Sequence, residues 1–175
     1  MKTNYFEELE TLLLEEHSKV QRDLIINYIG EDQEKLNALA YHFLGDDYRL
    51  AQRAAWPIGV IGIKNPNRIL PYLKDALLNA KHKHDAVKRN TIRILSEFKE
   101  IPISIESEAM NVCFDLLAKP KEAIAIKVFS MTVLFTLSKK YPEIQPELKI
   151  LIEEQIPTGS AGFKNRGQKI LKKLA

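Results

Sequence analysis

Three nine-residue segments of the 175-residue chain are versions of one another: VKRNTIRIL, IKVFSMTVL and FKNRGQKIL, which begin at Val87, Ile126 and Phe163. Their starts lie 39 and 37 residues apart. A fainter copy, AQRAAWPIG, begins at Ala51, 36 residues before the first. A period of this length is typical of a repeated pair of helices, in which each pair packs on its neighbours. The pattern therefore predicts a repeat protein, and it matches no enzyme motif.

A second pair of segments, not used to find this period, agrees with it. PYLKDALL begins at Pro71 and PELKILIE begins at Pro146, 75 residues later, where two repeats of 39 and 37 residues predict 76. Proline, leucine and lysine occupy matching places in the two segments. Duplication of one helix pair explains this agreement better than chance does.

Amphipathic spacing and helix-end signals predict ten helices and no strands. Two short helices broken near His17 and Ser18 form an N-terminal capping pair within residues 1–30, with Gly30 as the stop and Asp32 as the next N-cap. Four further pairs are expected at residues 32–63, 66–98, 104–139 and 143–173, and Pro120 is expected to introduce the second helix of the 104–139 pair. Because 45% of the residues are hydrophobic and the chain is short, we expect one domain spanning residues 1–175.

When the four nine-residue segments are aligned as second helices, each column of equivalent positions has a common character. Two columns are apolar and predict one buried stripe: Ala51, Val87, Ile126 and Phe163, and, seven residues later, Ile58, Ile94, Val133 and Ile170. The column between them holds small residues, which would let helices approach closely: Ala55, Thr91, Ser130 and Gly167. The column after the first apolar one is polar and is expected to form an exposed ladder: Gln52, Lys88, Lys127 and Lys164.

These features resemble the HEAT and armadillo-like family of helical repeats. The opening of a HEAT second helix, an apolar residue followed by a basic one, stands here as Val87-Lys88, Ile126-Lys127 and Phe163-Lys164, and Pro71 and Pro146 match the first-helix proline. The usual acidic residue five positions earlier is present only as Asp46. The resemblance covers roughly residues 32–173 and implies an all-α, right-handed α-solenoid of about five antiparallel helix pairs. It also implies that the second helices line a concave face where partners bind.

On such a face, basic side chains would form a band with Arg49, Arg53 and Trp56 at one end: Lys88, Arg89, Arg93, Lys127, Lys164 and Arg166. One interpretation is a structural ladder that snorkels over the repeat junctions. The other is an electrostatic footprint for phosphate or an acidic peptide. Trp56 precedes Pro57, which should kink its helix. The Trp56 ring either fills the gap that the kink opens or stacks on a ligand.

The sequence therefore predicts a non-enzymatic binding scaffold for a protein partner with an acidic surface. The alternative is a nucleic-acid-binding protein, distantly like the few HEAT-like solenoids that act as DNA glycosylases. The net charge of only +3 and the lack of aromatic residues among the basic ones count against that alternative.

Signatures of other function classes are missing from the sequence. There is no phosphate-binding loop, dinucleotide fingerprint or nucleophile elbow, so we expect neither catalysis nor a cofactor. Cys113 is predicted to be a buried thiol, and His82 and His84 lack the further ligands that a zinc site needs. The polar N-terminus and the lack of a long apolar stretch predict a cytoplasmic protein without membrane contact.

Overall fold

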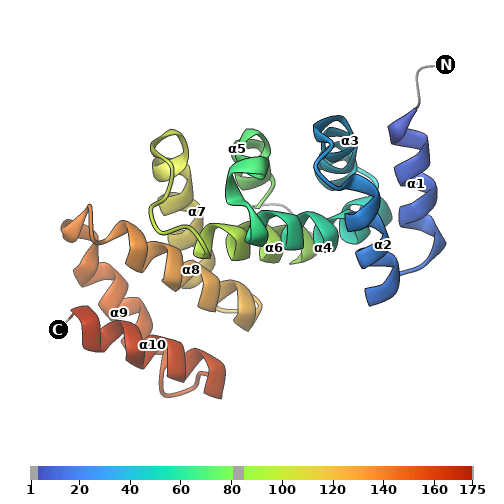
Figure 1. Ribbon diagram of the computed structural model, residues 1–175. Helices are drawn as coiled ribbons and strands as arrows, with labels where there is room; N and C mark the ends of the chain where they lie inside the picture. Colours follow the sequence, from blue (N-terminus) through green and yellow to red (C-terminus); the bar gives the residue numbers. More distant parts are fainter. Residues whose placement is uncertain (1–3, 81–84, 175) are drawn as a thin grey trace. The chain divides into compact units, whose positions relative to one another are not determined.

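A computed structural model of the chain describes residues 4–80 and 85–174 (Figure 1). The described residues form ten α-helices and three short 3₁₀ helices, with no strand among them. The chain divides into two compact units, Met1–Asn90 and Thr91–Ala175, and helix α6 (Asp85–Ser96) runs through the boundary. The expected single domain stays a prediction.

The first unit is a stack of antiparallel helix pairs. Its helices are α1 (Tyr5–Glu15), α2 (Lys19–Ile29), α3 (Gln33–Leu44), α4 (Tyr48–Lys64), the 3₁₀ helix η1 (Pro66–Ile69), α5 (Leu70–Asn79) and the start of α6. Helix α1 packs against α2, α3 and α4, and α3 packs against both α4 and α5. The N-terminal pair therefore covers the apolar side of the pair that follows it.

Side-chain caps define these helices where the sequence predicted them. The hydroxyl of Ser18 accepts a hydrogen bond from the Gln21 N–H, which confirms the break between the first two helices. Gly30 ends α2 with a φ of +49°, a backbone conformation that favours glycine. The Asp32 carboxylate accepts from the Glu34 and Lys35 N–H groups, and so fixes the start of α3.

The second unit repeats the same arrangement. It contains η2 (Ile103–Ile105), α7 (Glu106–Ala118), α8 (Ile124–Leu137), η3 (Pro142–Ile144), α9 (Gln145–Gln155) and α10 (Ala161–Leu174). Helix α7 packs against α8 and α9 packs against α10, while the two second helices, α8 and α10, also contact each other. The expected start of α8 at Pro120 was wrong. The helix begins four residues later, after a turn.

The column assignments for the buried stripe are confirmed. All eight apolar residues of its two columns are buried, and so are the four small residues between them. A fully buried leucine or isoleucine side chain contributes roughly 1.5–3 kcal/mol relative to an exposed one, so the stripe is a main source of stability in each unit. Pro57 lies within α4 and does not end that helix, which continues to Lys64.

Candidate functional site

The first and second helices of the pairs differ in their charge. The second helices α4 and α10 carry three and five basic side chains and no acidic one, whereas the first helices α1 and α7 carry four and three acidic side chains and no basic one. Among the described helices, no second helix is net acidic and no first helix is net basic. The second helices of each unit therefore offer a positive surface.

Two members of the predicted basic band, Lys88 and Lys127, are buried. Their residues are only 5% and 7% exposed, so the expectation that this column forms an exposed ladder was wrong for them. The Lys88 Nζ lies 2.9 Å from a carboxylate oxygen of Asp85, one turn earlier in α6. Long lysine side chains cover apolar surface with their methylene groups, and this allows a polar column to sit beside the buried stripe.

Lys127 bonds across the junction between the two helix pairs of the second unit. Its Nζ donates to Oε1 of Gln155, at 2.6 Å, at the end of α9. The Gln155 Nε2 in turn donates to the carbonyl oxygens of Leu117, at 3.0 Å, and Leu151, at 2.9 Å. Burial lowers the pKa of Lys127 below its ordinary value, and the nearby Glu122 carboxylate partly opposes that shift.

Arg53 and Trp56 face the N-terminal helix pair of the first unit. The Arg53 Nη1 donates to the carbonyl oxygen of Leu13 at 2.8 Å. The Arg22 guanidinium lies 4.8 Å from the centroid of the Trp56 ring, and the His17 ring centroid lies 5.8 Å from it. Both side chains are half-buried and bind within their own unit, an arrangement that stabilises the contact between α4 and the N-terminal pair.

The other five members of the predicted band reach solvent. Arg49, Arg89 and Arg166 are exposed, and Arg93 and Lys164 are half-buried. Arg49 and Arg89 belong to the first unit and the other three to the second. A single continuous band is therefore still a prediction.

The second unit has a surface that combines basic residues, which the sequence indicated, with an aromatic ring, which it did not indicate. On α8 the half-buried Phe135 ring lies 5.3 Å from the Nζ of Lys139 and 5.7 Å from the Nζ of Lys173, measured to its centroid. Arg166 and Lys169 share the face of Lys173 on α10, because residues three, four and seven apart lie on one side of a helix. We call these five residues the α8–α10 surface. Its signal in the sequence was the run of basic residues after Glu154.

A cleft of about 430 Å³ opens beside Lys127 in the second unit. Its apolar wall comes from Ala118, Pro120, Ile124, Leu151 and Phe163, and its polar wall from Glu122, Lys127, Glu154, Gln155, Thr158, Gly159 and Ser160. We call it the α8–α9–α10 cleft. Its residues come from helix ends and connections that are far apart in sequence, so no motif predicts it.

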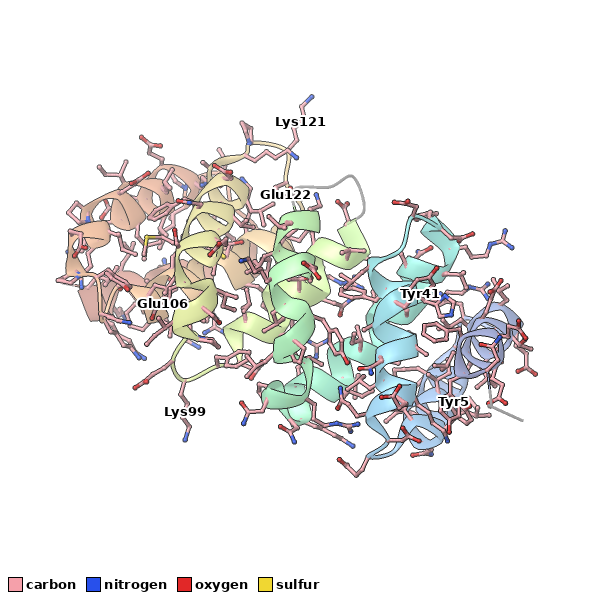
Figure 2. The ribbon with its side chains drawn as sticks, turned by 90° about the horizontal axis from the view of Figure 1, so that it is seen from above. Tyr5, Tyr41, Lys99, Glu106, Lys121 and Glu122 are labelled. Atoms are coloured by element: carbon pink, nitrogen blue, oxygen red, sulfur yellow. The ribbon has the colours of Figure 1, made fainter. Side chains whose placement is uncertain are left out.

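Glu122 forms part of this cleft and also supports the start of α8. Its Oε1 accepts a hydrogen bond from the Ala123 N–H at 3.0 Å, and its Oε2 lies 3.5 Å from the Nζ of Lys119. The Glu122 side chain is only 3% exposed. Figure 2 shows that neighbouring Lys121 points away from the protein in the same connection. Glu122 is therefore a buried carboxylate that is already engaged by a backbone N–H and an ammonium.

A second buried carboxylate, Glu106, lies at the start of α7 (Figure 2). It accepts hydrogen bonds from the Lys140 Nζ, at 2.8 and 2.9 Å, and from the Tyr141 hydroxyl, at 2.7 Å. The Lys140 hydrogen bond, followed by that of Tyr141, lowers the pKa of Glu106. The cluster joins the start of α7 to the connection that follows α8, where Lys140 lies 34 residues later in the sequence, and its contacts indicate a structural role.

The residues that the sequence offers for catalysis or metal binding are Cys113, His82 and His84. Cys113 is fully buried, and burial raises the pKa of its thiol to about 12, although the Ser130 hydroxyl opposes this shift. Its thiol is thus neutral and closed to substrates, as expected for a packed side chain. Within residues 4–80 and 85–174, no group of three or more metal-ligating side chains comes together. His82 and His84 lie outside the described residues.

No described helix is both long and apolar enough to cross a bilayer.

Comparison with known proteins agrees with the repeat pattern. Residues 9–174 match the HEAT repeat domain. A crystal structure described as an engineered protein is similar in fold, with a TM-score of 0.66 and 16% sequence identity, over 97% of this chain and 80% of that chain. At this identity the likeness shows the fold alone, an α-solenoid of helix pairs. No curated protein sequence matches the chain. Proteins with HEAT repeats are generally scaffolds for binding interactions, and the chain belongs to the HEAT repeat family.

Proposed function

We propose that this protein is a non-enzymatic scaffold that binds a protein partner with an acidic surface through its second helices. The observation that carries the proposal is the distribution of charge, since basic side chains collect on the second helices and acidic ones on the first. A field of one sign on one side of a scaffold attracts a partner of opposite sign and repels like-charged surfaces. The scaffold role follows from the family, and the acidic partner from this charge.

The burial of individual lysines decides which side chains would contact that partner. Lys88 and Lys127 are buried and have contacts within the protein, so neither side chain belongs to the exposed basic surface. The exposed side chains of α10 are better candidates: Arg166, Lys169, Lys172 and Lys173. Phe135 adds apolar area beside Lys173 and beside Lys139, which follows α8, as in protein interfaces that combine an aromatic anchor with charged neighbours.

Nucleic-acid binding is the second candidate function, and helix α10 is the observation that favours it. Five basic side chains without an acidic one would suit a phosphate backbone, and the Phe135 ring offers one stacking surface. We place it second because proteins that bind single strands use several aromatic rings in series, and the described basic surface of the second unit has one.

Reversing the charge of Arg166, Lys169 and Lys172 to glutamate should weaken the binding of an acidic peptide at least about tenfold, because each lost attraction and each new repulsion reduces affinity. We would measure this by fluorescence anisotropy with a labelled glutamate-rich peptide. The matched control reverses Lys74, Lys99 and Lys121, which are exposed, lie off the second helices and change the net charge equally.

Equal losses in the two triple variants would show that only the overall charge matters and would contradict the proposed surface. The same experiment with a mixed-sequence RNA and a DNA duplex tests the second candidate. Tighter binding of either nucleic acid than of the peptide, with a steep decline as salt rises, would favour that function instead.

A further inference from the structure

The α8–α9–α10 cleft contains a buried ammonium whose hydrogen-bond acceptor is a neutral amide. The Lys127 residue is only 7% exposed, and its Nζ donates to Oε1 of Gln155 at 2.6 Å. An ammonium has three N–H donors, and a buried charge is costly unless a counter-charge and further acceptors lie close to it. Glu122 is a nearby counter-charge, and an anion bound in the cleft would add a direct one together with further acceptors.

Two carboxylates lie near Lys127, those of Glu122 and Glu154. Glu122 is the nearby carboxylate that attracts the Lys127 charge, but its oxygens already face the Ala123 N–H and the Lys119 ammonium. Glu154 also lines the cleft, and its residue is exposed to water. These two acidic groups make a doubly charged anion such as phosphate a poor fit. A singly charged carboxylate is repelled less.

One wall of the cleft is apolar, and the cleft is large enough for a side chain or two. Ile124, Leu151 and Phe163 line it together with Ala118 and Pro120. A volume of about 430 Å³ lies at the lower end of the range for small-ligand pockets, in which a few polar groups orient a mostly apolar ligand. The chemistry of the walls thus suits a carboxylate beside an apolar group.

We propose that the α8–α9–α10 cleft binds a glutamate or aspartate side chain and an adjoining apolar side chain of the protein partner, with the Lys127 ammonium as the anchor. The proposal rests on the proposed function and adds a specific position to it. The carboxylate would accept from the Lys127 Nζ, and the neighbouring apolar group would cover Leu151 and Phe163. The exposed basic residues of α10 would attract the partner, and the cleft would select a residue pair on it.

Two short peptides and a free carboxylate, each titrated into the protein, test the ligand chemistry. The probes are acetyl-Leu-Glu-Leu-amide, its neutral match acetyl-Leu-Gln-Leu-amide, and hexanoate as a free carboxylate, each followed by NMR shifts of the cleft residues. We expect the glutamate peptide to bind at least about tenfold more tightly than the glutamine peptide. Equal binding of the two peptides would overturn the proposal, and tighter binding of hexanoate would assign the cleft to a free carboxylate instead.

Two variants test the residues. Lys127→Gln keeps a donor for Gln155 and removes the charge, so it should lose about tenfold in affinity for the glutamate peptide. Glu154→Gln removes a negative charge from the same cleft and should strengthen binding. If Lys127→Gln bound the peptide as the original protein does, or if Glu154→Gln weakened binding, the anchor role would be wrong. Because Glu154 is exposed, its variant remains informative should Lys127→Gln fail to fold.

The pH dependence gives an independent readout. Burial lowers the pKa of Lys127, while Glu122 opposes that shift, and the other charged groups facing this position are Glu154 and, through Glu122, Lys119. A bound carboxylate favours the charged lysine, so affinity should be greatest at neutral pH and fall as the pH rises through the pKa of Lys127. An affinity that stayed constant up to pH 11 would contradict the anchor role.

Failure of this inference and failure of the proposed function can be told apart. The reversed residues Arg166, Lys169 and Lys172 do not line the cleft. If their reversal abolishes peptide binding while Lys127→Gln does not, the basic surface stands and the cleft inference fails. If Lys127→Gln abolishes binding while the reversal has no effect, the cleft stands and the proposed surface fails.

Discussion

Replacing Gly167 with leucine should destabilise the second unit by about 3 kcal/mol, near the upper end of what overpacking a core usually costs. Gly167 occupies the small-residue column on α10, where an added Cβ would lie 2.8 Å from Cγ2 of Ile152 and 3.7 Å from Cδ1 of Ile156. Ile152 is fully buried and branched at Cβ, so its methyl group has little freedom to move. Urea unfolding followed by circular dichroism would measure the loss.

Gly162 provides the matched control in the same helix. An added Cβ there meets no atom within 4 Å, so Gly162→Ala should be neutral or stabilising by up to about 1 kcal/mol, because alanine restricts the unfolded chain and favours helix. If Gly167→Leu cost no more than Gly162→Leu, the small-residue column would not be a packing constraint.

Gly59 and Asn90 approach each other closely in the first unit. We therefore expect the effects of substituting these two residues on the free energy of unfolding to be strongly coupled. An added Cβ at Gly59 would lie 2.7 Å from Oδ1 of Asn90, whose residue is 2% exposed and whose Nδ2 donates to the Ala86 carbonyl at 2.9 Å. Gly59→Ala should therefore destabilise the protein by about 1–2 kcal/mol, after the gain in helix propensity is subtracted.

The sign of this effect should reverse when Asn90 is first replaced by alanine. The obstructing amide is then gone, and Gly59→Ala should stabilise that variant by up to about 1 kcal/mol through helix propensity. The difference between the two backgrounds is the coupling energy, measured by urea unfolding of all four proteins in a double-mutant cycle. Additive effects would show that α4 and α6 do not depend on this contact.

The parts of the fold that repeat could be predicted from the sequence. The aligned copies that begin at Val87, Ile126 and Phe163 showed which residues are buried, because equivalent residues of a repeated helix pair face the core in the same way. The start of α3 was equally clear, since Asp32 has a side chain suited to accept backbone N–H bonds. Helix starts at prolines were less exact, as the displaced start of α8 shows.

The repeat pattern could not predict whether a long side chain folds back onto the protein or extends into solvent. Lys88 and Lys127 share a column with the half-exposed Lys164, yet the first two fold back onto the protein while the third reaches water. The difference comes from neighbours outside the repeat pattern, Asp85 in one case and Gln155 in the other. For the same reason, neither the cleft nor the Glu106 cluster had a signal in the sequence.

The amide of Gln155 limits how the second unit can open. It joins the end of α9 to the last turn of α7 through the Leu117 carbonyl and to α8 through Lys127. If α9 opened alone, the Leu117 carbonyl and the Lys127 ammonium would both lose their hydrogen-bond partner. This cost disfavours local fraying. Amide hydrogens near the ends of α7 and α9 should thus exchange with solvent at a common rate, as members of one cooperative unit, although each helix taken alone would fray at its end.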